Sequence, residues 1–287
     1  MDNSIKIKIW LLNQLNGDEK GDKWGHRWRG TQKIRYEETI EFVKKNIDVN
    51  KKYDILDIGC SHGDFTKVIV ETFKNSNIFA TDISENAIKS AKKYVGKGDY
   101  EISELPNLPF RGKKFDLIFA IEVLYYLEEK DRLKSFENIY NKLNKGGYFV
   151  FSSVIDDGGG RYFDENDAIE KIKKYFKILD IGYVRTKGAV KFEQFFMRFI
   201  LYYNILQNID VYKSKKYSNG LKSIIVKLLS NKIVNLFIKI LIYPFYKVSE
   251  LIISSKTIMK IIKNMTIICC EKKVRGNILI IGRKISD

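Results

Sequence analysis

The stretch Ile55-Leu56-Asp57-Ile58-Gly59-Cys60-Ser61-His62-Gly63-Asp64-Phe65-Thr66 decides the fold of this chain. An apolar run with the pattern of a buried strand leads into a loop of small residues, and the loop leads into a segment with helical spacing. Small residues let the backbone approach a ligand closely, and the first turn of a helix offers free N–H donors. We therefore predict that a nucleotide-like ligand or an amino-acid carboxylate binds at this loop.

The segments around this loop alternate between strand and helix patterns. We expect helices over residues 31–47, 66–74, 84–95, 131–143 and 167–176, with Ser84 as an N-cap and Gly146-Gly147 as the stop of the fourth helix. We expect strands over residues 53–58, 78–81, 100–102, 115–121, 148–154, 178–183 and 277–281. This order predicts an α/β fold with a doubly wound, mostly parallel, seven-stranded sheet.

The residue types in the loop argue against two other kinds of site. A dinucleotide fingerprint, G-x-G-x-x-G, fails because the glycines are Gly59 and Gly63 with Ser61 between them. The same residues match G-x-S-x-G, the nucleophile elbow of the α/β-hydrolases. In that fold the catalytic histidine follows both the serine and the acid of the triad along the chain, so neither a residue next to the serine nor one before it can be that partner. The only histidines here are His26 and His62, so a hydrolase site is disfavoured.

The loop resembles the first motif of the class I S-adenosylmethionine-dependent methyltransferases, with Ser61 in place of the middle glycine. Asp82 follows Gly59 by 23 residues and is similar to the acid that pairs with both ribose hydroxyls in that family. A carboxylate suits a diol because it accepts two hydrogen bonds. Three further segments match the family in the same order: Glu104-Leu105 of the adenine loop, the fourth-strand motif at residues 115–127, and Gly146-Gly147 at the fifth strand.

The resemblance implies a Rossmann-like methyltransferase fold and S-adenosyl-L-methionine as the cofactor. Carried over residue by residue, it implies a cofactor site made of Asp57, Gly59, Cys60, Ser61, Gly63, Asp82, Ile83, Glu104, Leu105, Ile121 and Arg35. Within the family, the chain looks most like the nodulation-type N-methyltransferases of the methyltransferase type 11/12 group. That finer likeness rests on the Gly-Cys-Ser-x-Gly loop, on residues 122–127, and on Trp24 with Arg35-Tyr36. It does not carry over their chito-oligosaccharide substrate.

No single residue is predicted to be the catalytic base, and no metal is expected. Glu122 and Tyr125 lie past the fourth strand, where parallel sheets place their ligands. Glu122 is expected to hold a substrate ammonium or to take a proton. His62 is a base, a substrate contact, or a loop residue chosen only for its backbone conformation.

Several predicted site residues have a plain structural alternative. Trp24 and Arg27 belong to an aromatic and basic cluster that either closes over the site as a lid or forms a surface hairpin. Tyr126 is either a substrate contact or a core residue. Arg35 either reaches the methionine carboxylate or is a solvated arginine. Asp57 either orients the loop or binds the methionine ammonium through it, or it is a strand-end acid satisfied by the backbone.

Positive charge is concentrated in the last third of the chain. Residues 1–184 carry 31 basic and 30 acidic residues, whereas residues 185–287 carry 20 basic and 5 acidic ones. We divide the chain into residues 1–48, an N-terminal lid and first helix, and 49–188, the cofactor-binding domain. Residues 189–273 are a basic helical insertion, and 274–287 are the last strand of the domain.

The insertion is expected to form basic, apolar helices over residues 223–229, 233–243 and 248–262. Such helices favour an anionic membrane surface as a partner. A lid packed on its own domain, a second subunit and a polyanion stay open as alternatives. Nucleic acid is disfavoured because lysines stand among apolar residues here.

The cysteines Cys60, Cys269 and Cys270 indicate reduced thiols and a cytoplasmic location, peripheral at the inner face of the membrane if the helices bind there. Neither a signal peptide nor a membrane-spanning helix is expected. The expected function is methyl transfer to nitrogen or oxygen of a glycan, a lipid-linked molecule or a specialised small molecule. The alternative is a non-catalytic, membrane-associated protein that keeps the cofactor-binding fold. The oligomeric state stays open.

Overall fold

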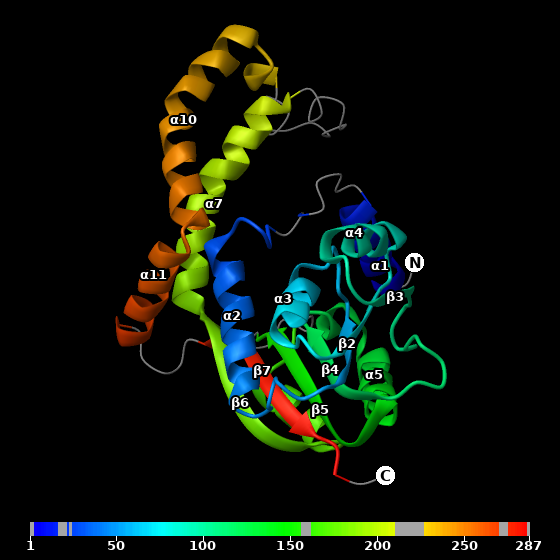
Figure 1. Cartoon of the computed structure of the whole chain (residues 1–287). Helices are drawn as coiled ribbons and strands as arrows, with labels where there is room; N and C mark the ends of the chain where they lie inside the picture. The colour runs from blue at the N-terminus through cyan, green and yellow to red at the C-terminus, as the bar shows by residue number, and fades with distance from the viewer. Residues whose placement is uncertain are drawn as a thin grey trace. The chain divides into compact units, whose positions relative to one another are not determined.

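A seven-stranded sheet with the order β3-β2-β1-β4-β5-β7-β6 forms the centre of the fold (Figure 1). Its strands are β1 Asp54–Ile58, β2 Asn77–Asp82, β3 Asp99–Ile102, β4 Phe115–Ile121, β5 Leu143–Val154, β6 Lys177–Thr186 and β7 Arg275–Arg283. Strands β1 to β5 pair in parallel, and β7 runs antiparallel between β5 and β6. The predicted doubly wound, mostly parallel, seven-stranded sheet is confirmed.

The structure, a computed structural model, describes residues 3–16, 22, 25–155, 162–209, 227–269 and 275–285. The chain divides into two units. The first comprises Met1–Trp28, Gln32–Thr186 and Arg275–Asp287, and the second comprises Arg29–Thr31 and Lys187–Val274. The expected N-terminal segment 1–48 therefore belongs to the sheet-containing unit, apart from residues 29–31.

The helices associated with the sheet are α1 Asn3–Asn16, α2 Gly30–Lys44, α3 Asp64–Thr72, α4 Glu85–Val95, the 3-10 helix η1 Leu124–Tyr126, α5 Glu129–Lys142 and α6 Glu165–Lys173. Ser84 caps α4 as predicted, because its hydroxyl accepts a hydrogen bond from the Ala87 N–H. The predicted stop of α5 at Gly146-Gly147 is wrong. The helix ends at Lys142, since Leu143 is already extended and begins β5.

Strand β4 is buried on both faces of the sheet. Phe115 and Ile118 belong to the core that α5 and α6 cover. Leu117 and Phe119 belong to the core that α2 and α3 cover. Burying side chains of this size stabilises the fold by roughly 1.5–3 kcal/mol each. This packing holds the carboxyl ends of the adjacent strands β1, β2 and β4 side by side. The loop at residues 59–63 begins at this end of the strands.

The second unit contains three described helices: α7 Lys187–Gln207, α10 Lys232–Ser254 and α11 Lys256–Cys269. Helices α7 and α10 pack along each other, with Phe199 stacked on Phe245 and Tyr203 stacked on Tyr246. The expected break between residues 243 and 248 is wrong, because α10 continues through Pro244. Residues 223–226 of the first expected helix lie outside the described residues.

Candidate cofactor and acceptor site

The loop after β1 has a backbone that depends on its glycines. Gly59 and Gly63 both have positive φ angles, 73° and 86°. A Cβ on Gly59 would lie 2.5 Å from a methyl of Val123, and a Cβ on Gly63 would lie 2.7 Å from a methyl of Val95. Ser61 also has a positive φ, 49°, where glycine is normally favoured. The serine therefore replaces the middle glycine of the motif while keeping its left-handed conformation.

Asp82, the last residue of β2, holds this loop in place. One carboxylate oxygen accepts a hydrogen bond from the Ser61 N–H at 2.9 Å. The other accepts one from the Ser84 N–H at 3.0 Å. Burial raises the pKa of the Asp82 carboxyl, and these backbone donors counteract that rise. The predicted ribose-binding acid therefore also positions the loop.

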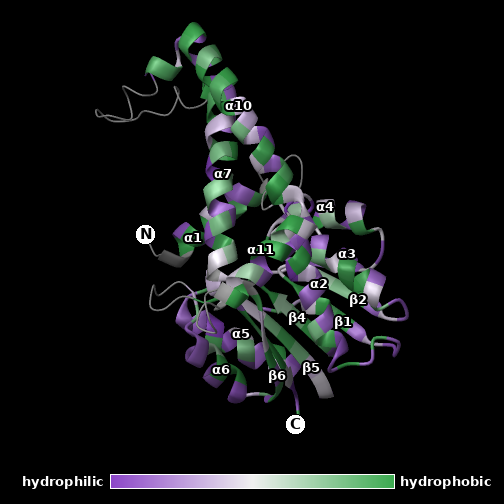
Figure 2. Cartoon of the chain, turned by 90° about the vertical axis from the view of Figure 1, so that its left-hand side faces the viewer, coloured by the Kyte–Doolittle hydropathy of each residue, from purple (hydrophilic) through white to green (hydrophobic). Residues whose placement is uncertain are grey.

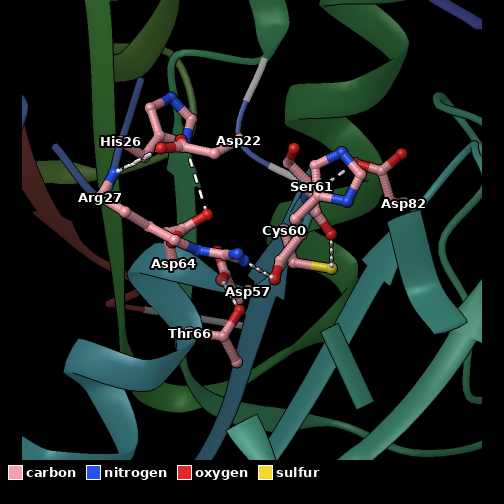
Figure 3. A network of polar contacts seen from close by, with 10 residues as sticks. Asp22, His26, Arg27, Asp57, Cys60, Ser61, Asp64, Thr66 and Asp82 are labelled. Carbon is pink, nitrogen blue, oxygen red and sulfur yellow. Dashed lines mark hydrogen bonds and ion pairs between the residues drawn. The ribbon is translucent and has the colours of Figure 1, made fainter. Parts of the chain in front are cut away.

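Asp57 lies buried near the end of β1, beside the loop. The Thr66 hydroxyl of α3 donates to its carboxylate at 2.6 Å (Figure 3). The hydrogen-bond partner is therefore a side chain rather than the backbone. Burial raises the pKa of Asp57 to about 7.

A first cavity, of about 240 Å³, opens beside the loop. Five of the predicted cofactor residues line it: Gly59, Asp82, Ile83, Glu104 and Leu105. Its other lining residues include Ile58, Val123, Leu127 and, from α1, Ile5, Lys8 and Leu11. An apolar cavity with a carboxylate at its edge suits a nucleoside, whose base is flat and whose sugar carries two hydroxyls.

A second cavity, of about 200 Å³, shares Leu11, Gly59, Asp82, Val123 and Tyr126 with the first. It is lined by further predicted residues: Arg35, Asp57, Cys60, Ser61, Ile121, Glu122 and Tyr125. Gly63, His62 and Arg27 are not among the lining residues of either cavity. The two cavities thus bring together most of the predicted site around the loop and the end of β4.

Three buried polar atoms at the second cavity have no hydrogen-bond partner within the described part of the chain. They are Ser61 Oγ, Arg35 Nε and Gln32 Oε1. Because unpaired buried polar atoms are costly, such a group of donors and acceptors suits a polar ligand such as an amino-acid moiety. Arg35 is only 6% exposed, so the alternative that it is a solvated arginine is wrong.

Glu122 and Tyr125 face the second cavity from the segment after β4. One oxygen of Glu122 accepts hydrogen bonds from the Ser152 hydroxyl at 2.7 Å and from the Asn277 amide at 2.8 Å. These bonds fix the carboxylate on a residue with a φ of 58°. Burial raises the pKa of Tyr125 well above its ordinary value, which keeps the phenol protonated. His62, the third catalytic candidate, is buried.

Arg27 is held on the N-terminal side of α3. Its guanidinium donates to Asp64 at 2.7 Å and to the His62 carbonyl at 3.5 Å (Figure 3). It also lies 3.9 Å from the centre of the Tyr94 ring. Arg27 therefore anchors the segment before α2 to the first residue of α3. Trp24, the other lid candidate, lies outside the described residues.

Among the described residues, no cluster of histidine, cysteine and acidic side chains is arranged to hold a metal ion. Cys60 is buried, and burial raises the pKa of its thiol well above its ordinary value. Cys60 is therefore a protonated lining residue of the second cavity rather than a nucleophile.

A comparison with known protein families gives a match that includes the loop after β1. Residues 55–147 match the family model described as a methyltransferase domain. This segment of the chain is therefore similar to a methyltransferase domain. The match runs from β1 to the start of β5 and includes the loop, Asp82 and Glu122.

The relatives of this segment include enzymes with different acceptors. Malonyl-[acyl-carrier protein] O-methyltransferase 1 of Ilyobacter polytropus is 31% identical over 136 residues, which cover 44% of this chain and 46% of that protein. Nodulation protein S of Azorhizobium caulinodans is 28% identical over 134 residues, covering 45% and 63%. The chain therefore spans about half to two thirds of the length of these curated relatives.

A solved structure shares the fold. It is the N-methyltransferase NodS from Bradyrhizobium japonicum in complex with S-adenosyl-L-homocysteine, with a TM-score of 0.53 and 20% identity. The similarity covers 65% of this chain and 92% of that one. At this identity the similarity supports the fold, and the nodulation-type likeness expected from the sequence agrees with the similarity to nodulation protein S.

One part of the first unit was not predicted from the sequence. Helix α1 contributes Ile5, Lys8 and Leu11 to the first cavity, and Lys8 forms an ion pair with Glu104. The helix is only weakly amphipathic, but Ile7, Leu11 and Leu15 recur every four residues and were a usable signal. Gln32 lines the second cavity but carried no motif that would single it out. His26 also lines that cavity, and it belongs to the aromatic and basic cluster noted before the first helix.

Proposed function

We propose that this protein transfers a methyl group from S-adenosyl-L-methionine to a nitrogen or oxygen atom of its acceptor. The observation that carries the proposal is the pair of adjoining cavities that meet at Gly59 and Asp82. One cavity suits a nucleoside and the other offers polar atoms to an amino-acid moiety. They lie at the carboxyl ends of parallel strands, where such folds bind their ligands.

The residues at the first cavity are proposed to hold the adenosine part of the cofactor. Ile58, Ile83 and Leu105 offer apolar contacts to the base. Asp82 offers carboxylate lone pairs to the ribose hydroxyls while it keeps its bonds to the loop backbone.

The residues at the second cavity are proposed to hold the methionine part. The guanidinium of Arg35 provides a positive charge for the carboxylate, since arginine pairs with carboxylates in a fixed geometry. Asp57 and Ser61 lie on the same cavity and are the proposed partners of the ammonium group. Both residues are positioned by the backbone of the β1 strand and its loop.

When bound, the cofactor supplies a methyl group already activated on a sulfonium. The protein then has to orient the acceptor and exclude water. Glu122 is the proposed residue that holds the N–H or O–H of the acceptor, because Ser152 and Asn277 fix its position at the second cavity. Tyr125 remains protonated and is proposed to donate a hydrogen bond.

Several classes of methyl acceptor are compatible with the proposed reaction. The relatives are named for malonyl-[acyl-carrier protein] methylation and for nodulation, so they support methyl transfer but favour no single acceptor. We propose a glycan, a lipid-linked molecule or a specialised small molecule.

Calorimetric titration with S-adenosyl-L-methionine tests the cofactor site. We expect binding to the wild-type chain and a loss of affinity of about tenfold or more in Asp82→Asn, since hydrogen bonds to charged groups contribute roughly 1.5–3 kcal/mol each. The matched control is Asp99→Asn, an exposed acid at the start of β3. Because Asp82 also holds the loop, the variant's thermal unfolding is measured beside the titration.

Two results would contradict the proposal. One is a wild-type chain that does not bind the cofactor. The other is a folded Asp82→Asn variant that binds it as tightly as Asp99→Asn does. If the wild type binds the cofactor but transfers no labelled methyl group to any molecule in extracts of its source, the non-catalytic alternative gains.

A further inference from the structure

One face of helix α10 carries a row of exposed apolar side chains. Ile233, Phe237, Ile240, Val248 and Leu251 recur at helical spacing, and each side chain is between 52% and 80% exposed. Pro244 falls on the same stripe and is also exposed. At 3.6 residues per turn, these positions share one face of the helix. Figure 2 shows the hydrophobic colouring along this helix.

The opposite face of α10 is buried and partly polar. Asn235 and Ser249 are 7% and 1% exposed. The Asn235 side chain donates to the carbonyls of Leu206 and Leu229 within the second unit. A helix at the surface of a soluble protein normally buries its apolar stripe and exposes its polar one. Helix α10 has the reverse arrangement, so its exposed stripe requires an apolar environment from outside the chain.

Helix α11 also exposes an apolar stripe. Ile258, Ile261, Met265 and Ile268 share one face and are between 38% and 80% exposed, while Met259 is buried. Exposed apolar side chains therefore run along two successive helices of the same unit.

The charges of these helices identify the chemistry of the partner. The spans of α7, α10 and α11 contain nine basic and only two acidic residues. Both acids are already paired: Glu193 is buried against Arg29, and Glu250 pairs with Lys247 at 2.8 Å. A surface that combines exposed apolar stripes with unbalanced lysines matches the interface of an anionic bilayer, which offers acyl chains and phosphates together.

We propose that the exposed faces of α10 and α11 dock on an anionic membrane surface. The apolar stripes enter the boundary between headgroups and acyl chains, and lysines such as Lys239 and Lys260 reach the phosphates. No helix in the described part of the chain is both long enough and apolar enough to span a bilayer. The proposed mode of binding lays the helices along the surface. This inference goes beyond methyl transfer and does not depend on it.

Co-sedimentation of the full chain with lipid vesicles tests the proposal. We expect binding to phosphatidylcholine vesicles that contain phosphatidylglycerol, and weak binding to phosphatidylcholine alone. Binding should weaken as salt is raised from about 0.1 M to about 1 M, because the screening length shortens from about 10 Å to about 3 Å. Lys260→Gln should weaken binding about fivefold, in line with roughly 1 kcal/mol per basic residue.

The double variant Phe237→Gln/Leu251→Gln removes two members of the stripe and should weaken vesicle binding by at least about tenfold. The matched control is Leu133→Gln, which changes an exposed leucine on α5. It should leave vesicle binding unchanged. Both proteins should still bind S-adenosyl-L-methionine, which separates a failure of this proposal from a failure of the cofactor assignment.

Three outcomes would overturn the proposal. The wild-type chain fails to sediment with anionic vesicles at low salt. The double variant binds vesicles as well as Leu133→Gln does. Alternatively, light scattering shows a wild-type dimer that the double variant converts to a monomer while vesicle binding is unchanged, which would make a second copy of the chain the occupant of the stripe.

Discussion

The loop after β1 and helix α10 both combine apolar and polar side chains, but they differ in which of these are buried. Around the loop, Phe65 is buried and Val123 is half-buried, and the Asp57 and Asp82 carboxylates accept hydrogen bonds from within the chain. On α10, the apolar residues lie outside and Asn235 lies inside. The first arrangement buries its apolar side chains within one chain and leaves polar atoms such as Ser61 Oγ and Arg35 Nε for a ligand. The second is complete only with an external apolar partner.

The difference separates residues that determine the free energy of folding from residues that determine association with a partner. Around β4 and the loop, each side chain is held by several neighbours, so changes there should cost folding free energy. On the exposed stripe of α10, the same changes should leave folding almost unaffected and alter only association with a partner.

Replacing one phenylalanine in each region gives the largest expected contrast. Phe119 in β4 is fully buried, whereas Phe237 in α10 is 63% exposed. Phe119→Ala should lower the free energy of unfolding by about 3–5 kcal/mol through the cavity it leaves. Phe237→Ala should change it by less than about 0.5 kcal/mol. Urea denaturation measures both, and equal losses would contradict the contrast.

Two glycines with the same φ angle sharpen the description of the loop. Gly59 and Gly96 both have φ of 73°, but a Cβ meets Val123 at Gly59 and nothing within 4 Å at Gly96. Gly96→Ala should cost about 1–2 kcal/mol of left-handed strain. Gly59→Ala should cost about 1–3 kcal/mol more, from overlap. It should also weaken cofactor binding, because Gly59 lines both cavities. Similar losses of stability in denaturant titrations would show that the tight contact is absent.

The pH dependence of stability tests the burial of Asp57. Burial raises its pKa to about 7, above its value in an unfolded chain of about 3.9. The folded state therefore holds this proton more tightly. The resulting stability is fully present below about pH 4 and is lost as the pH rises through about 7. The slope should reach about 1.4 kcal/mol per pH unit within that window.

Asp57→Asn is the comparison for that slope. The amide cannot ionise but can still accept a hydrogen bond from Thr66. All other titrating groups are present in both proteins, so their contributions cancel in the difference between the two free energies of unfolding. Because the amide mimics the protonated acid, the free energies of unfolding of the two proteins should lie close together at low pH and separate above about pH 4, where the wild type loses stability. Parallel curves would mean that Asp57 titrates as an exposed acid does.

Much of the secondary structure of the first unit could be predicted because it is determined by short stretches of sequence. The apolar run at Phe115–Ile121 fixes β4, and the small residues between Gly59 and Gly63 fix the loop. Asp82 was predicted from its place at the end of β2. What the pattern missed depends on tertiary contacts. The burial of Arg35 and the anchoring of Arg27 by Asp64 depend on residues far away in sequence.

Helix boundaries show the same limit. Gly146-Gly147 is a local stop signal, but β5 begins earlier because Leu143 already pairs with Phe115 of β4. Pro244 is a local helix breaker, yet α10 continues through it while its buried face packs on α7. In both places a contact distant in sequence outweighs a strong local preference.

A crystal structure of the chain grown with S-adenosyl-L-homocysteine tests the central claim most directly. We predict electron density for the ligand across both cavities, with its ribose hydroxyls within about 3 Å of the Asp82 carboxylate, the usual hydrogen-bond range. The amino-acid part should lie beside Ser61 and Arg35. Density for the ligand elsewhere, or a ribose without contact to Asp82, would contradict the proposed site.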